Sequence, residues 1–417
     1  MSSAQEPETV NQAAAATPPA AVELQPVRIE LLELPADPAG QEENGPGSHY
    51  DRCVVPIAAA GQAVARTNDP ARTVLGPNVA WGPDGFTVVA TANGQVRVHE
   101  SRVWVDDILG IPGDVDFNTG NLEYDRDICI RGSVQDLFKV TSRGTIRVMR
   151  DIEAAEVRAA MDLLVAGGIS GKEKGHCFAG HDVKARYIRN STVEAGNDVI
   201  AVNEISHSRV ICGGRVHVDR GSIMAGHVTA AGGVTCDSLG CSSDTQTVIE
   251  AGIDEALRRL AAKDAPKIDA DIRQIEKIRE TVEPLLRHQK GLTAEQKEKA
   301  TELLYNASEL EERHQETIAL LRRSHADAAA RGKEEIVVNG HVHDGVIVHF
   351  RGVEAAVPPG IRGPLRIVPR AAGGERQIVV THRGSTSGFG LETHQHADPI
   401  LDALDRILTT KPQAAAA

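Results

Sequence analysis

The histidines in the central part of the chain are the residues whose type and spacing most directly suggest chemistry. A neutral imidazole can take up a proton as a general base, and such a group would support an acyl-transfer reaction. Five histidines lie within residues 176–227, at His176, His181, His207, His217 and His227. Acid–base catalysis is therefore one hypothesis, and the elements that position these side chains decide its weight.

Metal binding is a second hypothesis, because H-x-H spacing occurs at His341 and His343 and again at His394 and His396. Two imidazoles without a third ligand or a nearby carboxylate make a weak site, so we assign no metal ligand. The six cysteines include no C-x-x-C pair and no zinc-type spacing. We expect small buried thiols at Cys53, Cys129, Cys177, Cys212, Cys236 and Cys241.

The motifs of other enzyme and binding classes are missing from this sequence. It contains neither G-x-x-x-x-G-K-[ST] nor G-x-S-x-G. The net charge of −13 and the 3% aromatic content argue against binding to nucleic acid or to an anionic membrane surface. No apolar run reaches the roughly 20 residues of a membrane span, and the start of the chain lacks a signal-peptide pattern. We expect a cytoplasmic protein without catalytic residue, cofactor or transmembrane segment.

The elements that carry the histidines belong to an internal repeat. Three series of apolar residues recur along the chain at intervals of 16 to 20 residues. The first series is Ile128, Ile146, Leu163, Val183, Val199, Val216 and Val234. The second is Val134, Ile152, Ile169, Ile188, Ile205 and Ile223, and the third is Val140, Val157, Cys177, Val193, Val210 and Val228. An internal repeat of this length predicts a solenoid.

Three short apolar marks per turn predict a three-faced parallel β-helix. Side chains alternate between the two faces of a strand, so Val216 and Val218 should point inward while Arg215 and His217 face solvent. The glycines of the repeat, such as Gly180 and Gly196, are expected at corners, where a positive φ is cheapest for glycine. The segment 169–177 is two or three residues too long for its face, and we expect a bulged loop there.

The apolar spacing changes to three and four residues after Ile253, which predicts two helices. Pro284 should break or kink the first helix, and Thr293 with Gln296 should form a capping box at the start of the second. We predict an antiparallel coiled-coil hairpin with a bend that exposes apolar residues. Those residues are a candidate partner contact, although they could instead close the hairpin against themselves: Pro284, Leu285, Leu286 and Leu292.

These patterns divide the chain into six parts. A disordered acidic tail (1–50) is followed by a small β-rich domain (51–112) and the β-helix (113–252). The coiled-coil hairpin (253–333) then precedes a β segment that completes the β-helix (334–380). The last part (381–417) is expected to be a flexible tail that contains a short helix at 398–409.

Several segments together resemble the flagellar assembly protein A family. They are GDVDFNTGNLEYDRDICIRGSV, VAGGISG, KARYIRNSTVEAGNDVIAVNEISHSRVICGG, GSIMAGHVTAAGGV and, after the hairpin, IVVNGHVHDGVIVHF. The resemblance covers about residues 51–380, and its TGN motif is Thr119, Gly120 and Asn121. It implies a bacterial β-helical protein, similar in architecture to bactofilins and to the C-terminal domain of MinC. The right-handed sense of the coil is adopted from the same analogy.

The resemblance implies a non-enzymatic scaffold in flagellar assembly or placement, acting through protein–protein contacts or self-association. Its expected partners are flagellar or polarity proteins or a second copy, with no nucleic acid, and its place is the cytoplasm, with recruitment to the cell pole or the inner membrane face. Two alternatives stay open. One is a hexapeptide-type acyltransferase, although its hexad repeat is stricter than the variable turns here. The other is a bactofilin-like cytoskeletal polymer unrelated to flagella.

Overall fold

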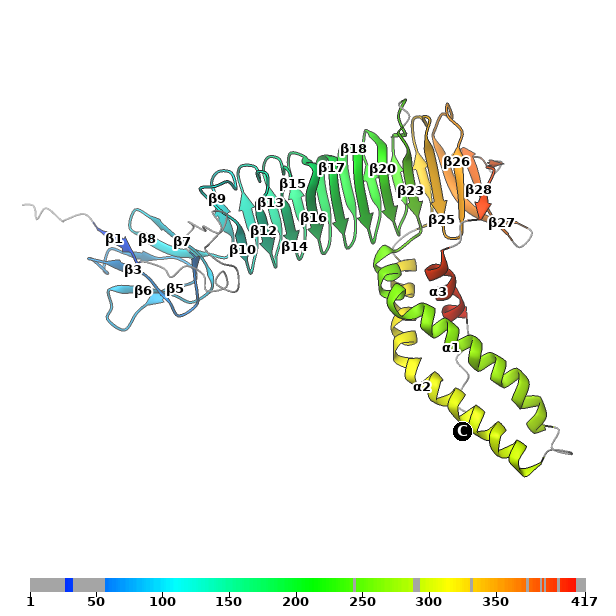
Figure 1. Ribbon diagram of the computed structural model, residues 1–417. Helices are drawn as coiled ribbons and strands as arrows, with labels where there is room; N and C mark the ends of the chain where they lie inside the picture. Colours follow the sequence, from blue (N-terminus) through cyan, green and yellow to red (C-terminus); the bar gives the residue numbers. More distant parts are fainter. Residues whose placement is uncertain are drawn as a thin grey trace, which may run out of the picture. The chain divides into compact units, whose positions relative to one another are not determined.

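The chain forms two compact units (Figure 1). The first unit holds residues 27–32 and Ala58–Val105, and the second holds Ile57 and the described residues from Asp106 onward. In this computed structural model the described residues are 27–32, 57–242, 245–287, 293–330, 333–372, 375–382, 385, 388–395 and 398–409.

The first unit consists of two four-stranded sheets around a small apolar core. The sheet orders are β1-β3-β6-β5 and β2-β7-β8-β4. Val64, Val88 and Val103 are fully buried between them. The strands are β1 (Ile29–Leu31), β2 (Ile57–Ala58), β3 (Ala63–Thr67), β4 (Val74–Leu75), β5 (Val79–Trp81), β6 (Thr87–Ala90), β7 (Gly94–His99) and β8 (Arg102–Asp106).

Strand β1 lies inside the segment that was expected to be a disordered tail. It pairs antiparallel with β3, with Ile29 opposite Thr67 and Leu31 opposite Ala65, and Ile29 packs against the core of the unit. The expectation of disorder is therefore wrong at residues 29–31, because alternating apolar residues let a short edge strand add to an existing sheet. The rest of the tail lies almost entirely outside the described residues.

The second unit contains the β-solenoid, and every member of the three predicted series pairs with the next in parallel register. Ile128 pairs with Ile146, and Val199 pairs with Val216. The series also extend beyond the predicted members, back to Leu109 and onward to Ile336. The first strands are β9 (Leu109–Ile111), β10 (Leu122–Tyr124), β11 (Ile128–Ile130), β12 (Lys139–Ser142), β13 (Ile146–Val148), β14 (Glu156–Ala159), β15 (Leu163–Val165) and β16 (Ile169–Ala179).

The later coils continue the same ladder, and their side chains alternate as predicted. Val216 and Val218 are buried while Arg215 is exposed and His217 is half-buried. Their strands are β17 (Val183–Ala195), β18 (Val199–Cys212), β19 (Val216–Val218), β20 (Ser222–Ala230), β21 (Val234–Cys236), β22 (Ser238–Leu239), β23 (Thr247–Ala251), β24 (Ile336–Val338) and β25 (Val346–Phe350). The mainly β fold with a solenoid is thus the one that the repeat predicted.

The corner glycines Gly180 and Gly196 act through close approach and not through positive φ. A Cβ on Gly180 would lie 2.1 Å from the carbonyl oxygen of Ala160, and one on Gly196 would lie 2.0 Å from that of Gly180. Positive φ angles occur instead at another corner, at Asn190 (46°) and His207 (48°). Positive φ is therefore the wrong reason for Gly180 and Gly196, although their corner position was right, and it is the right reason at Gly233, whose φ is 97°.

Hydroxyl groups support the corner at which these positive φ angles occur. The amide of Gly171 donates to Oγ of Ser191 at 2.7 Å, and the amide of Ser191 donates to Oγ of Ser208 at 3.2 Å. The amide of Ala225 donates in the same way to Oγ1 of Thr247 at 2.8 Å. Each hydroxyl thus satisfies a buried amide of the preceding coil that the sharp corner would otherwise leave without a partner.

The bulged loop predicted at residues 169–177 is present. The register between β16 and β17 shifts between Ser170 and Gly175, and Lys172 and Glu173 both have positive φ angles, of 48° and 65°. Nζ of Lys172 lies 2.7 Å from Oδ2 of Asp136, a residue two coils earlier. The extra residues therefore fold back along the corner of the preceding coils.

Antiparallel strands follow the last parallel coil. Strand β26 (Val353–Val357) pairs with β25, and β27 (Leu365–Ala372) pairs with both β24 and β28 (Glu375–His382). The short strands β29 (Gly388–Gly390) and β30 (His394–Gln395) pair with β28 and β26. These strands run antiparallel to the strands that they pair with, so the parallel ladder ends at β24 and β25.

Two long helices connect β23 to β24, as the change in periodicity predicted. They are α1 (Glu255–Arg287) and α2 (Ala294–Ala330). The capping box is confirmed, since the amide of Gln296 donates to Oγ1 of Thr293 at 3.3 Å and the amide of Thr293 donates to Oε1 of Gln296 at 3.0 Å. Pro284, however, does not end the first helix at its own position, because α1 continues to Arg287.

Candidate interaction site

The base of the helical hairpin has an apolar cluster of its own, separate from the solenoid core. A third helix, α3 (Pro399–Thr409), lies against α1 and α2 there (Figure 1). Its inward side chains are almost fully buried, as for Leu404 and Ile407. The cluster consists of Ile253, Leu257, Ala261, Ala265, Ile268, Leu321, Leu401, Ala403, Leu404 and Ile407.

The packing of α3 corrects the expectation of a flexible tail after residue 380. The predicted helix at 398–409 exists, but it is docked and not free, because Leu401, Leu404 and Ile407 form one apolar side that the hairpin covers. Oδ1 of Asp398 accepts hydrogen bonds from the amides of Ile400 and Leu401 and so caps the start of the helix.

Ion pairs hold α3 on the hairpin at both of its ends. Nε and Nη2 of Arg406 lie 2.5 and 2.8 Å from the two carboxylate oxygens of Asp269, and Asp269 is only 5% exposed. The hydrogen bond from Arg406, together with Arg273, lowers the pKa of Asp269 despite its burial. Nη2 of Arg258 lies 2.8 Å from Oδ2 of Asp398. Complementary charges thus fix the position of the helix as well as its direction.

A salt bridge connects the first turns of α1 to the third face of the solenoid, which is the face that carries the third apolar series. Nη1 of Arg259 lies 2.9 Å from Oε2 of Glu194. Burial would raise the pKa of Glu194, but Arg259 and His176 outweigh it and lower the pKa. The neighbouring outward side chain Ile211 is only 7% exposed. This part of the face is therefore covered and not open to solvent.

A buried carboxylate with histidine neighbours lies farther along the same face. Oε1 of Glu250 lies 3.2 Å from Nε2 of His227 and 3.8 Å from Nδ1 of His349, and Thr229 donates to Oε2 at 2.9 Å. Burial would raise the pKa of Glu250, but the interactions with His227, Thr229 and His349 outweigh it and lower the pKa to about 2. The cluster therefore stabilises an ionised Glu250 inside the protein.

Polar pairs also join the two helices of the hairpin along its length. Nε2 of His314 lies 2.8 Å from Oδ2 of Asp271, and both side chains are largely buried. Nη2 of Arg279 lies 2.8 Å from Oε2 of Glu311. Pairs of this kind within an otherwise apolar seam favour one register of two helices over others.

The predicted partner contact at the bend lies mostly beyond what can be described. Pro284 is exposed near the end of α1. Leu285 and Leu286 fall within the bounds of α1, and Leu292 lies outside the described residues. The assignment of these four residues to partner binding therefore stays a prediction.

The five histidines that suggested acid–base chemistry are spread over the solenoid. His176 and His227 lie in one row of the solenoid face that carries the third apolar series. In this row His176 pairs with Thr192, Thr192 with Arg209, and Arg209 with His227, one coil further on each time. His217 lies in the first-face strand β19, where its Nε2 is 2.7 Å from Oδ1 of Asp219. The remaining two lie at corners, and they are His181 and His207. The coil thus places these imidazoles at separate positions.

One histidine forms a group with two carboxylates that sequence spacing did not reveal. Nδ1 of His181 lies 2.9 Å from Oδ1 of Asp162, and the ligand atoms of Asp162, His181 and Asp182 lie within 4.8 Å of one another. The hydrogen bond to Asp162 raises the pKa of His181. The coil period could have revealed this group, because Asp162 lies one turn of the solenoid before Asp182.

The two aspartates of this group also have a structural task. Oδ1 of Asp162 accepts the amide of Asp182 at 3.1 Å, and Oδ1 of Asp182 accepts that of Asp198 at 3.2 Å. Oδ1 of Asp198 accepts the amide of Arg215 at 2.7 Å. The carboxylates form a ladder that satisfies one amide of each following coil, which explains their presence without a metal ion.

The other candidates for metal or thiol chemistry are in ordinary settings. The rings of His341 and His343 lie 6.4 Å apart, and His394 lies in β30, while His396 is outside the described residues. Burial raises the pKa of three thiols to about 12, which keeps them protonated, at Cys177, Cys212 and Cys236. Cys129 and Cys241 are half-buried, and Cys53 lies outside the described residues.

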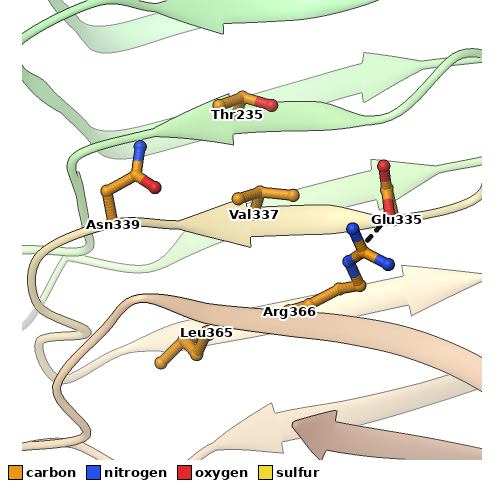
Figure 2. Close-up of a pocket in the computed structure, with 6 residues that line it drawn as sticks. All are labelled: Thr235, Glu335, Val337, Asn339, Leu365 and Arg366. Atoms are coloured by element: carbon orange, nitrogen blue, oxygen red, sulfur yellow. Dashed lines mark ion pairs between the residues drawn. The ribbon is translucent and has the colours of Figure 1, made fainter. Parts of the chain in front are cut away.

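A shallow pocket of about 250 Å³ lies where the parallel ladder meets the antiparallel strands (Figure 2). Its polar side is an ion pair, with Nε of Arg366 3.0 Å from Oε2 of Glu335. Its lining contains no histidine, cysteine or serine. The lining residues are Thr235, Glu335, Val337, Asn339, Leu365 and Arg366.

None of the helices in the part of the chain that the structure describes is long and apolar enough to cross a membrane. Comparison with curated proteins and with solved structures found no match. The model of the Flagellar Assembly Protein A beta solenoid domain matches residues 107–359. That range contains the parallel coils, the helical hairpin and the first antiparallel strand, and it is more than half of the chain. The chain therefore belongs to the Flagellar Assembly Protein A family.

Proposed function

We propose that this flagellar-assembly protein is a non-enzymatic cytoplasmic scaffold, which holds other proteins during flagellar assembly or placement. The observation that carries the proposal is the position of the hairpin within the ladder. Strand β21 pairs directly with β24 across the insertion, and β23 pairs with β25. The strand pairing of the coils therefore continues across the insertion, and a long helical insertion that this pairing does not need is a natural element for binding partners.

The electrostatics favour proteins over nucleic acid as partners. The net charge is −13, and some arginines of the solenoid surface pair with carboxylates of adjacent coils, as Arg147 does with Asp127 and Arg126 with Asp107. Such compensated charges provide no phosphate-binding track.

The first test is the number and position of flagella in cells that lack this gene. We expect missing or misplaced flagella, restored by the wild-type gene, because a scaffold acts at the assembly stage. Normal flagella in the deletion strain would refute the flagellar role and leave a general cytoskeletal polymer as the better hypothesis. In that case the purified protein should form filaments visible by electron microscopy.

The bend of the hairpin is tested by replacing residues 283–294 with a short glycine linker. If the apolar residues there bind a partner, the variant should lose that partner in pull-downs while its circular dichroism spectrum stays that of the wild type. Unchanged recovery of the partner would refute partner binding at the bend. Turnover of acyl-CoA by the purified wild-type protein would overturn the non-enzymatic assignment and favour the acyltransferase alternative.

A further inference from the structure

One corner of the solenoid carries arginines that have no carboxylate partner. It lies where the face of the first apolar series turns into the face of the second, just after strands such as β11 and β13. The four side chains are exposed, and none of them forms an ion pair within the part of the chain that the structure describes. We call them the arginine corner, and they are Arg131, Arg150, Arg186 and Arg220.

The two aspartates that lie next to these arginines in the sequence are engaged elsewhere. Oδ1 of Asp151 accepts the hydroxyl of Tyr187 at 3.0 Å, and Oδ1 of Asp219 lies 2.7 Å from Nε2 of His217. The corner is thus an uncompensated positive strip on a chain whose net charge is −13. Such a strip attracts a ligand of opposite charge.

The coil period sets the distance between the arginines. The amide of Arg186 donates to the carbonyl oxygen of Gly167 at 2.7 Å, and the amide of Gly167 donates to that of Arg150 at 3.1 Å. The amide of Arg220 donates to the carbonyl oxygen of Val202 at 3.2 Å, and Val202 lies one coil after Arg186. Two coils therefore separate each arginine from the next, which is about 10 Å along the solenoid axis.

A row of glutamates with the same repeat lies on α2. Its members recur every seven residues, which is about 10.5 Å along a helix and returns to the same side of it. All four are exposed. One of them, Glu309, lies 3.4 Å from Arg313 on the helix surface, whereas the other three form no ion pair with another described residue. We call this set the glutamate row, and it consists of Glu295, Glu302, Glu309 and Glu316.

We propose that the glutamate row of α2 binds the arginine corner of a second copy of the chain. Opposite charge and the shared repeat of about 10 Å identify this occupant, because every second coil then faces every second turn of the helix. Exposed apolar side chains add contact area on both surfaces. Met149 and Val202 are 55% and 41% exposed at the corner, and Tyr305 and Leu320 are 70% and 51% exposed on the side of α2 that carries the row.

The chain's own hairpin is attached to a different part of the solenoid. Arg259 of α1 binds Glu194 on the third face at 2.9 Å, and in a three-faced coil that face lies opposite the corner between the other two. The row that fits the corner is therefore that of another copy. Because two different surfaces pair, each copy keeps one free corner or row, and association continues as a chain or closes as a ring. The use of this assembly rests on the proposed scaffold function.

Charge reversal tests the proposal in the full-length protein. The corner variant carries Arg150→Glu and Arg220→Glu, which lie four coils or about 20 Å apart. The row variant carries Glu302→Arg and Glu316→Arg, which lie about 21 Å apart on α2, so the two pairs match in either direction of the helix. In a mixture the reversed row fits the reversed corner, and the unchanged row fits the unchanged corner. Both pairings are available only between chains.

We expect the wild-type protein to exceed one-chain mass in low salt in analytical ultracentrifugation. It should return to one-chain mass at about 1 M salt, where the Debye length is about 3 Å. Each variant alone should associate at least about 10-fold more weakly, because two attractive pairs become repulsive, and mixing the two variants should restore the larger mass. The matched control is Arg209→Glu with Arg215→Glu, which changes the charge equally at exposed arginines outside the corner and should behave like the wild type.

A wild type that stays at one-chain mass in low salt would overturn the proposal, as would one-chain mass in the mixture or equal weakening in the control. Association that is lost in the corner variant but kept in the row variant would overturn α2 as the occupant and favour another acidic segment of the chain. If circular dichroism shows that a reversal unfolds the protein, alanine at the same positions carries the test, and each alanine variant should also associate more weakly.

The mass readout is independent of flagella. Association with normal flagella in the deletion strain refutes only the scaffold role, and missing flagella with a one-chain mass of the wild type refutes only this contact.

Discussion

The solenoid and the base of the helical hairpin are stabilised in different ways. In the solenoid each inward residue stacks on its equivalents in the adjacent coils, as Val183 does between Leu163 and Val199. In the hairpin base a small apolar cluster is oriented by individual charge pairs, above all Asp269 with Arg406. Repetition carries stability in the first region, whereas specific pairing carries it in the second.

This comparison predicts that a core substitution destabilises different parts of the chain in the two regions. The largest loss of unfolding free energy is expected in the solenoid. Ile188 is fully buried and pairs with Ile169 on one side and Ile205 on the other. Ile188→Ala should lower the free energy of unfolding by about 4 kcal/mol, because it leaves a cavity in a packed core. Hydrogen exchange should accelerate in its own coil and in both neighbouring coils, as expected when stability depends on adjacent repeats.

The same change in the hairpin is the matched control. Ile268 is 1% exposed within the hairpin cluster, so Ile268→Ala removes the same atoms from a different kind of core. Exchange should accelerate in α1, α2 and α3 and stay unchanged in the coils around Ile188, because the hairpin can open on its own. Equal acceleration in those coils would show that the two regions unfold as one and would contradict the comparison.

The next effect concerns Glu250, a buried carboxylate of the solenoid that lies beside His227. Its pKa falls from 4.5 to about 2 in the folded protein, so its ionised form contributes stability that is complete above pH 4.5 and is lost as the pH falls toward 2. Glu250→Gln should therefore cost at most about 3 kcal/mol at neutral pH. Denaturation at successive pH values should show the cost shrinking below pH 4.5.

A second carboxylate on the same face provides the control for Glu250. Glu123 is exposed in β10, so Glu123→Gln should change the free energy of unfolding by only a few tenths of a kcal/mol at any pH. If Glu250→Gln were equally harmless, or if its cost did not depend on pH, the buried cluster with His227 would not be a source of stability.

The features that could be predicted from the sequence are those that depend on residues close in the chain or one repeat apart. The three apolar series predicted every parallel pair of the central coils, because in a solenoid the contact partner of a residue is its equivalent one period later. The capping box of Thr293 and Gln296 was predicted for a similar reason, since its two residues lie three positions apart. Local patterns fix local partners.

The features that escaped prediction depend on contacts that the repeat does not encode. The spacing of Leu401, Leu404 and Ile407 indicated a helix, but not its docking face, because Arg406 and Asp269 lie 137 residues apart. The group of Asp162 and His181 was missed although it follows the coil period, since only apolar residues were aligned. Asn190 has a positive φ beside the amide of Ser191, which donates to a hydroxyl of the next coil, and a single segment does not show this contact.

The smallest predicted effect belongs to the hairpin and tests its purely local pairing. Thr293→Ala removes the side chain that accepts the amide of Gln296, and loss of such a cap costs about 1 kcal/mol. Thr301→Ala is the matched control, because Thr301 lies inside α2 and its hydroxyl only donates to the carbonyl oxygen of Lys297. Alanine is the better helix former there, so this variant should be neutral or slightly stabilising.

Amide exchange in the first turns of α2 should therefore accelerate in Thr293→Ala and stay level or slow in Thr301→Ala. The α3 cluster lies at the other end of the hairpin, so neither change should alter the exchange of α3 or of the solenoid. Faster exchange in α3 after loss of the cap would mean that the hairpin transmits disorder along its whole length. The bend and the apolar cluster at the base of the hairpin would then act as one cooperative element.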